Sequence, residues 1–175
     1  WDAFHGYHMG VTAENVATKF QVTRDDQDKF ALNSQEKALK AQKENKFKEE
    51  IINFKIKSKK NETNFNKDEH PREEINFEAL KRLKPVFKKD GTVTAGNASG
   101  INDGAAAVTL MSEKEAEKRK LKKLVSIKSW ASCGVDPALM GTGPIPASKK
   151  ALELAGWSIK DVDLFEINEA FAAQS

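Results

Sequence analysis

The passage of this 175-residue chain with the most unusual chemistry runs over residues 94–107 and reads TAGNASGINDGAAA. Backbone without bulky side chains can approach another molecule closely. The passage predicts either a loop laid against an extended ligand, with Ser99, Asn97 and backbone N–H groups as donors, or a tight loop packed under a helix. It is not a phosphate-binding P-loop, because the Gly-Lys-[Ser/Thr] ending of that motif is absent.

Asn168 lies in the sequence NEAF, where a predicted strand meets a predicted helix. Ligands of open α/β sheets gather at the carboxyl ends of the strands. An asparagine at this place either caps the helix through its side-chain oxygen or holds a water molecule for an oxyanion site. The residues alone leave both roles open.

The histidines and the single cysteine give little support for metal or thiol chemistry. His5 and His8 are three residues apart, but a zinc site needs more ligands and His70 lies far off in a polar stretch. We therefore expect no metal, and a packed or surface position for His8. One cysteine excludes an intramolecular disulfide framework. Cys133 is expected to be a buried, inert thiol, because a nucleophilic thiol needs a nearby base or a helix N-terminus.

The composition is that of a globular chain, with 39% hydrophobic residues, 31% charged residues and a formal net charge of +3. It contains no apolar run of about 18 residues, so no membrane span is expected. The basic residues are mostly lysines interleaved with acidic ones, which is typical of solvated helix faces and does not favour nucleic-acid binding. The first residues lack the charged start and apolar core of a signal peptide. Because the chain begins at Trp1 and ends at Ser175 inside an apolar run, we expect a piece of a longer protein.

The first part of the chain predicts charged helices. Thr12 is expected to cap a short helix that contains Val16 and Phe20. Thr23 followed by Asp26 predicts the start of a second helix over residues 24–44. The apolar stripe of this helix is narrow, so we expect it to be peripheral; the residues of the stripe are Gln27, Phe30, Ala31, Ser34, Ala38 and Ala41. Further along we expect a strand at 52–56, an exposed polar loop at 57–68 and a helix at 77–83.

The character of the sequence changes near Thr92, where lysines give way to small residues. Ser112 with Glu115 predicts a capping box for a helix to residue 121. Two prolines precede a helix over 147–155 that Gly156 closes. Apolar runs predict strands at 105–111, 124–131 and 162–167, and a last helix starts at Asn168. Strands that alternate with helices predict an α/β layered sheet with crossovers, following a mostly helical part that ends near residue 98.

Three long passages resemble the thiolase family. They are YHMGVTAEN at 7–15, GTVTAGNASG at 91–100 and NEAFAAQ at 168–174, and MGTGPIP at 140–146 agrees with them. Motifs of this length in this order are highly specific, and the likeness is weakest at 57–68. The Tyr-His-Met-Gly form and Ala173 resemble the acetyl-CoA C-acetyltransferase branch more than the long-chain 3-ketoacyl-CoA thiolases.

The resemblance implies a layered αβαβα core of two similar halves, with a mostly helical loop domain inserted in the first half. On that map residues 1–98 match the loop domain, residues 99–122 the end of the N-terminal half, and residues 123–175 the start of the C-terminal half. The chain would then hold only part of the core. Its apolar strands would lack neighbours, and we expect poor solubility when it is expressed alone.

The resemblance also implies a reaction, the Claisen condensation of acyl-CoA thioesters or its thiolytic reverse. In the family one Cys is acylated, a second Cys moves a proton at the α-carbon, and a His with a bound water stabilises the enolate oxyanion. Neither Cys motif and no Gly-His-Pro motif occurs here, and Cys133 matches none of them. We expect these groups elsewhere in the complete protein, and we expect this chain alone to be inactive.

What can be carried over from the family is a set of binding positions. Asn168 matches the asparagine that holds the oxyanion-hole water. Ser99 and His8 match residues beside the pantetheine arm, and small residues such as Ala95 let that arm approach the backbone. The matches near the acyl group are the apolar residues Met9, Met140 and Phe171. The matches towards the pantetheine and nucleotide end are Phe87 and Arg72.

The expected function is therefore acyl transfer on acetyl-CoA or acetoacetyl-CoA in a cytoplasmic enzyme of lipid metabolism. Coenzyme A and acyl-CoA are expected as substrates, with no permanently bound cofactor, no metal, no nucleic acid and no membrane. The family implies a homo-tetramer or dimer. The alternatives are a 3-ketoacyl-CoA thiolase of fatty-acid β-oxidation, a non-catalytic thiolase-like lipid-binding protein, and a basic interaction module.

Overall fold

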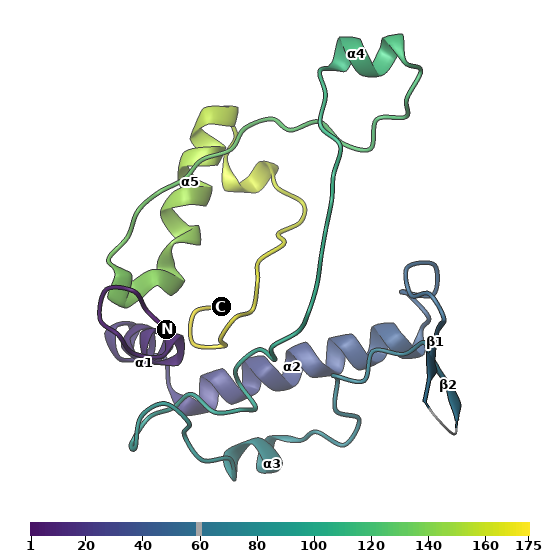
Figure 1. The fold of residues 1–175 in the computed structure, drawn as a ribbon. Coiled ribbons are helices and arrows are strands. Elements are labelled where there is room, and N and C mark those ends of the chain that lie inside the picture. Colours follow the sequence, from purple (N-terminus) through teal and green to yellow (C-terminus); the bar gives the residue numbers. More distant parts are fainter. Residues whose placement is uncertain (59–60) are drawn as a thin grey trace. The chain divides into compact units, whose positions relative to one another are not determined.

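A computed structural model describes residues 1–58 and 61–175 and divides the chain into two compact units. The first unit comprises Trp1–Gly100 together with Asn168–Ser175, and the second comprises Ile101–Ile167. Figure 1 shows the elements along the chain. The expected boundaries at 98/99 and 122/123 concern the halves of a thiolase core, and they stay a prediction.

Helix α1 (Met9–Phe20) is capped by His8, whose side chain accepts a hydrogen bond from the Gly10 N–H at 3.0 Å. The prediction that Thr12 caps this helix is wrong. The helix begins one turn earlier, and the buried Thr12 hydroxyl donates back to the Met9 carbonyl at 2.5 Å. Val16 is buried as expected, whereas the Phe20 side chain is 54% exposed.

Helix α2 (Arg24–Lys43) has the predicted capping box. The Asp26 N–H donates to the Thr23 hydroxyl at 3.1 Å, and the Thr23 N–H donates to the Asp26 carboxylate at 3.1 Å. The hydrogen bonds from the Thr23 hydroxyl and the Thr23 N–H lower the pKa of Asp26 below its ordinary value. Gln27 and Ala31 of the predicted stripe are buried, and so is Asp28, which the sequence analysis did not single out.

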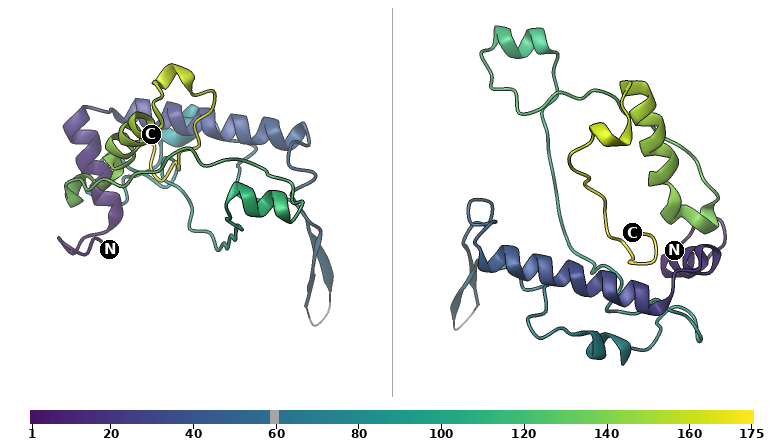
Figure 2. Two further views of the ribbon diagram at one scale, coloured as in Figure 1. Left: turned by 90° about the horizontal axis from the view of Figure 1, so that it is seen from above. Right: turned by 180° about the vertical axis from the view of Figure 1, so that it is seen from behind.

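A two-stranded antiparallel hairpin follows α2 and projects beyond the end of that helix (Figures 1 and 2). The strand expected at 52–56 forms as β1 (Phe54–Lys57) and pairs with β2 (Glu62–Phe65). The expected loop at 57–68 is therefore wrong where β2 lies, although every residue of β2 is exposed as predicted. Phe54 lies opposite Phe65, a cross-strand aromatic pair that favours this register. Residues 59–60 of that predicted loop lie outside the described residues.

Helix α3 (Phe77–Lys81) begins at its Asn76 cap and ends two residues earlier than predicted. Leu80 is almost fully buried, at 2% exposure, whereas Leu83 is 38% exposed. The guanidinium of Arg24 on α2 donates to the carbonyls of Leu80 and Leu83, at 2.8 and 2.9 Å. These bonds tie α3 to α2, and the Leu80 carbonyl also accepts from the Leu83 N–H at 3.0 Å.

The second unit contains helices whose capping residues the sequence predicts, although the first of them ends at Lys118 and not at the predicted residue 121. Helix α4 (Glu113–Lys118) is capped by Ser112, which accepts from the Glu115 N–H. Helix α5 (Pro144–Ala155) ends at Gly156, whose φ of 68° is left-handed. The two prolines lie in the first turn of α5 rather than before it, because that turn needs no N–H donors. Two short 3-10 helices, η1 (Pro137–Thr142) and η2 (Ile159–Asp161), complete this unit.

The strands predicted at 105–111, 124–131 and 162–167 do not form. Among the described residues the β1–β2 hairpin is the one sheet, so these segments have no neighbouring strand to pair with. Their apolar side chains stay exposed, with Val108 at 83%, Val125 at 84% and Leu164 at 87%. A strand needs a hydrogen-bonded neighbour as well as an apolar pattern, which is why the pattern alone gave the wrong result.

The helix predicted to start at Asn168 is also wrong. Residues 168–175 form turns, and Phe171 makes an isolated antiparallel bridge with Ala98. The hydrophobic core of the first unit brings this segment to α1, because Ala173 packs with Ala13, Ala17 and Val93. In the part of the chain that the structure describes, no helix has the length and apolar character to cross a membrane.

Candidate functional site

Three aromatic side chains from distant parts of the first unit form one cluster. The Phe87 ring stacks on the His8 ring with 4.5 Å between centroids and an interplanar angle of 18°. Phe171 meets Phe87 edge to face, with 6.2 Å between centroids. Three residues that the sequence analysis selected as separate binding positions therefore lie together. Phe87 and Phe171 pack on the core, while His8 is exposed at the start of α1.

Gly10 makes room for this cluster, although nothing in the sequence around it predicts that role. A Cβ atom at Gly10 would lie 2.2 Å from the Phe87 Cδ2 atom. No side chain fits at that distance, so the ring lies directly against the backbone of the first turn of α1. The Gly10 N–H also donates to Nδ1 of His8, which leaves Nε2 of the neutral ring as the protonated nitrogen.

The buried carboxylate of Glu14 on α1 holds the start of the small-residue loop. It accepts hydrogen bonds from the N–H groups of Thr92 and Val93, both at 2.8 Å, and from the Thr92 hydroxyl at 3.1 Å. Glu14 is 3% exposed and Val93 is fully buried. A carboxylate that accepts several backbone N–H bonds replaces the water it loses on burial. A signal in the sequence was available, since Glu14 is an acidic residue within the apolar stripe of Ala13 and Ala17.

Asn97 holds the middle of the same loop. Its side-chain oxygen accepts from the Thr94 N–H at 2.7 Å, and its side-chain nitrogen donates to the Asp28 carboxylate at 2.9 Å and to the Thr92 carbonyl at 3.1 Å. The second oxygen of Asp28 accepts from Arg24 Nε at 2.8 Å. One of the two structures predicted for the loop used Asn97 as a donor to a ligand, but Asn97 is buried and these protein groups occupy its side chain.

Two backbone hydrogen bonds join the small-residue loop to the segment of Asn168. The Ala172 N–H donates to the Asn97 carbonyl at 2.9 Å, and the Ser99 N–H donates to the Ala170 carbonyl at 3.0 Å. Ser99 and Asn168 are both exposed. The small residues at 97–99 thus lie against the protein's own chain, as in the second predicted structure, but their partner is the non-helical segment 170–172 and not a helix.

The other predicted positions are dispersed. Met9 is half-buried at the start of α1, and Ala95 is exposed in the loop. Arg72 is exposed, and its backbone N–H donates to Gln35 Oε1 at 2.9 Å. Met140 belongs to the second unit, in η1, and is 41% exposed.

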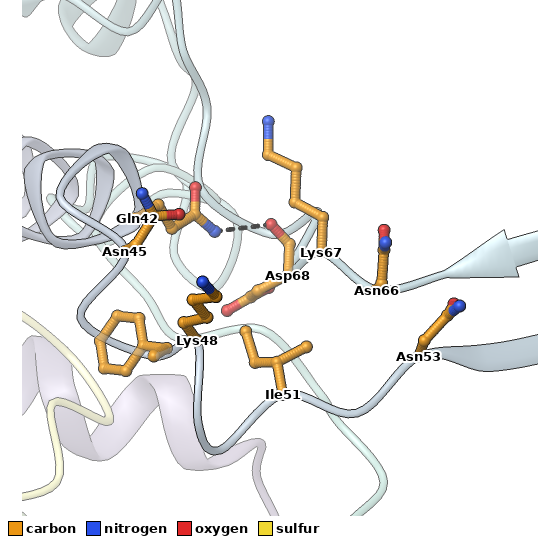
Figure 3. A pocket seen from close by; sticks show the side chains of 9 residues that line it. Gln42, Asn45, Lys48, Ile51, Asn53, Asn66, Lys67 and Asp68 are labelled. Atoms are coloured by element: carbon orange, nitrogen blue, oxygen red, sulfur yellow. Dashed lines mark hydrogen bonds between the residues drawn. The ribbon is translucent and has the colours of Figure 1, made fainter.

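A shallow pocket of about 390 Å³ lies where α2 ends and the hairpin begins (Figure 3). Amides, lysines and a few apolar residues line it, and Gln42 Nε2 donates to the Asp68 carbonyl at 2.8 Å. Lys67 on its rim pairs with Glu73 at 2.5 Å, which raises the pKa of Lys67 and lowers that of Glu73. None of the predicted site residues lines this pocket.

The histidines and Cys133 were considered for metal and thiol chemistry. Within residues 1–58 and 61–175, no group of three or more His, Cys, Asp or Glu side chains could hold a metal ion. His5 Nδ1 instead lies 3.0 Å from the Asp2 carboxylate. Burial acts to raise the pKa of Asp2, but hydrogen bonds from His5 and Phe4 outweigh it and lower that pKa. Cys133 is a free thiol that is partly exposed, so the expectation of a buried thiol is wrong.

The aromatic cluster, the small-residue loop and its pairing partner all fall within sequence matched by known proteins. The profile of the thiolase N-terminal domain matches residues 1–114, and that of the thiolase C-terminal domain matches residues 121–175. The chain therefore belongs to the thiolase family. Its fold is a part of the α/β thiolase fold.

Curated relatives are similar over almost the whole chain. An acetyl-CoA acetyltransferase of Rhizobium meliloti (strain 1021) is 59% identical over 174 residues, which cover 99% of this chain and 44% of the relative. A cytosolic acetyl-CoA acetyltransferase of Mus musculus is 58% identical over 176 residues, with the same two coverages. The chain thus spans less than half the length of the curated relatives it matches.

Solved structures agree. The acetyl-CoA acetyltransferase of Bacillus anthracis superposes with a TM-score of 0.91 at 51% identity, covering 99% of this chain and 44% of that one. The human mitochondrial 3-ketoacyl-CoA thiolase superposes with a TM-score of 0.87 at 47% identity, covering 95% of this chain and 42% of that one.

Proposed function

We propose that this chain is the central segment of an acetyl-CoA acetyltransferase, in which it binds acyl-CoA and supports the oxyanion hole. The complete enzyme would join two acetyl-CoA molecules into acetoacetyl-CoA or cleave acetoacetyl-CoA with CoA. The observation that carries the proposal is the match to both thiolase domains together with coverage of only 44% of an acetyl-CoA acetyltransferase at 59% identity.

The chemistry assigned to the rest of the protein is thioester exchange followed by Claisen condensation. A cysteine thiolate attacks the thioester carbonyl and expels CoA as a thiolate, which leaves an acyl-enzyme. A second acyl-CoA loses an α-proton to a base, and its carbanion attacks the acyl-enzyme carbonyl and releases the cysteine. Oriented hydrogen-bond donors stabilise the oxyanions that form on the way. This chain contributes Asn168, which would hold the water that donates to the enolate oxygen.

The proposed binding roles come from the family resemblance, and the contacts of Phe87 with His8 and Phe171 support them in the first unit. The exposed Nε2–H of His8 and the exposed Ser99 would lie along the pantetheine arm, and Ala95 keeps that path open. Phe171 and Met9 would shield the acyl end from water, which strengthens the oxyanion hydrogen bonds. Met140 is proposed for the acyl end as well. Phe87 and Arg72 are proposed for the pantetheine and nucleotide ends of the ligand.

The exposed apolar segments support a place inside a larger core. Residues 105–111, 124–131 and 162–167 carry apolar side chains without neighbours in this chain, and the remainder of an αβαβα core would supply both the sheet partners and the cover. The proposed boundary at residue 122 lies next to the gap between the two matched thiolase domains. We expect the isolated chain to aggregate.

The remaining proposals concern the substrates, the oligomeric state and the cellular location of the complete enzyme. Coenzyme A and acyl-CoA act as substrates and no cofactor is bound permanently. The complete enzyme is a homo-tetramer or dimer that binds neither nucleic acid nor membrane. The proposed location is the cytoplasm, supported by the mouse and rat relatives whose names include "cytosolic".

The test is CoA-dependent cleavage of acetoacetyl-CoA by the complete protein, run beside the 175-residue chain. We expect turnover by the complete protein and none by the chain. An active isolated chain, or a complete protein with no cysteine nucleophile and no turnover, would reject the proposal. The latter result would favour a non-catalytic lipid-binding protein.

A 3-ketoacyl-CoA thiolase of fatty-acid β-oxidation is the second candidate, because the human mitochondrial enzyme of that name superposes with a TM-score of 0.87. Substrates of four and eight carbons separate the two. A higher kcat/KM for the four-carbon substrate supports the first proposal, and a higher value for the eight-carbon substrate supports the second.

A further inference from the structure

The Asn97 side chain and backbone connect three segments of the first unit. Its side chain bonds the Asp28 carboxylate of α2 and the Thr94 N–H of its own loop. Its backbone carbonyl accepts from the Ala172 N–H, four residues after Asn168. Asn97 therefore ties both the loop that bears Ser99 and the segment that bears Asn168 to α2. Two further bonds from α2 act beside it, from Gln27 Nε2 to the Thr92 hydroxyl at 2.9 Å and from the Ser34 hydroxyl to the Glu169 carboxylate at 2.5 Å.

Asp28 is an unusual partner because it is a fully buried carboxylate, with 0% exposure. Burying a charge is costly unless it is paired and hydrogen-bonded. One oxygen of Asp28 bonds Arg24 and the other bonds Asn97, so both oxygens are used. Arg24 in turn donates to two carbonyls at the end of α3. A hydrophobic pair would fill this space with a smaller desolvation cost. It would not fix the position of the loop along the axis of α2.

We propose that Asp28 and Asn97 form a positioning pair that sets the loop of Ser99 against the segment of Asn168, and so aligns the pantetheine-binding edge with the oxyanion support. The inference rests on the proposed function for its consequence in catalysis. The pair itself touches no substrate. It acts through the hydrogen bonds of Ala172 and Ser99, which bridge the two segments.

The chemistry of the pair permits an exchange of its two members. Asp28→Asn alone places an amide beside the amide of Asn97 and the guanidinium of Arg24, and one donor is left without an acceptor. Asn97→Asp alone places two carboxylates in contact. In the double variant D28N/N97D, the new Asn oxygen accepts from Arg24 and its nitrogen donates to the new Asp. The Thr94 N–H keeps a carboxylate acceptor, whereas the Thr92 carbonyl loses the donor that it has in Asn97 Nδ2.

The experiment compares both single variants, the exchanged double variant and the unchanged complete protein. A matched control, D25N/N33D, makes the same exchange between exposed positions of α2. The first measurement is hydrogen exchange at the Ala172 and Ser99 amides without substrate. The second is KM and kcat for acetoacetyl-CoA. Thermal unfolding gives the stability of each variant.

We expect each single variant to exchange both amides faster and to raise KM about tenfold, the effect of a coupling of ordinary size. The exchanged double variant should lie closer to the unchanged protein than either single variant in both readouts, because the contact between positions 28 and 97 is restored while the Thr92 carbonyl stays without its donor. The control should alter neither readout. If a single variant fails to fold, the double variant still decides, because only a coupled pair restores folding by exchange.

A double variant that regains thermal stability but not KM would overturn the positioning role, and so would a double variant no better than the singles. An inactive unchanged protein would instead overturn the proposed function. In that case the exchange rates at Ala172 and Ser99 alone decide whether the pair couples the two segments.

Discussion

The ring of Phe87 lies against the backbone of Gly10 so closely that a methyl group on Gly10 would sit 2.2 Å from a ring carbon. The same ring stacks on His8 and meets Phe171 edge to face. A residue without a side chain thus determines where the aromatic cluster of the site can lie.

Gly10→Ala should displace the Phe87 ring and disturb both of its aromatic contacts. We expect a loss of about 1–3 kcal/mol in the free energy of unfolding, as for overpacking of a filled core. Binding of CoA to the complete protein, followed by calorimetry, should weaken. Gly134→Ala is the matched control, because nothing lies within 4 Å of its added Cβ atom. Equal stability and equal CoA affinity of the two variants would contradict the claim that Gly10 makes room for the Phe87 ring.

Glu14→Gln should destabilise the start of the small-residue loop. The carboxylate accepts from two backbone N–H groups, and the amide nitrogen of glutamine would face at least one of them as a second donor. We expect a loss of about 1–3 kcal/mol, the cost of a buried unsatisfied group, measured by denaturant unfolding. Glu36→Gln on the exposed face of α2 should stay within about 0.5 kcal/mol of the parent. A loss no larger than that of the control would show that the loop does not depend on Glu14.

Asp26 should make the stability of α2 depend on pH at the acidic end. Its hydrogen bonds to Thr23 lower its pKa in the folded protein below the ordinary value of 3.8. The unfolded chain therefore binds the proton first as the pH falls, and stability is lost with falling pH. The advantage of the parent over Asp26→Asn is fully present above that ordinary value. It disappears as the pH drops through the lowered pKa.

The measurement for Asp26 is the unfolding midpoint of the parent and of Asp26→Asn at several pH values. Thr23→Ser keeps a hydroxyl cap and should follow the parent, whereas Thr23→Ala should lose about 1 kcal/mol at neutral pH. An advantage of the parent that grows below the ordinary pKa would have the wrong sign for this explanation.

Local patterns were enough to predict the parts of the fold that short-range interactions determine. The Thr23–Asp26 capping box, the Ser112 cap and the Gly156 C-cap each depend on groups within a few residues, and all three form. Thr12 was predicted as a cap because of its residue type, but the histidine at position 8 fills that role through Nδ1. When several residues along a chain could accept the capping hydrogen bond, residue type alone does not show which of them begins the helix.

Long-range interactions explain what the sequence did not predict. The strand at 105–111 fails because a strand depends on a neighbour, which this chain does not bring to it. Glu14 and Asp28 were missed because their partners, Thr92 and Asn97, are 78 and 69 residues away. Asp28 carried one local signal, its position four residues after Arg24 on a helix. The aromatic contact of His8 with Phe87 became evident only in three dimensions.

The most direct measurement of the central claim is steady-state thiolysis of acetoacetyl-CoA by the complete protein with Asn168→Ala. Asn33→Ala, on the exposed surface of α2, is its control. If this chain supplies the support of the oxyanion hole, Asn168→Ala should lower kcat by roughly 10²-fold while KM changes little. A kcat equal to that of the control would contradict the account.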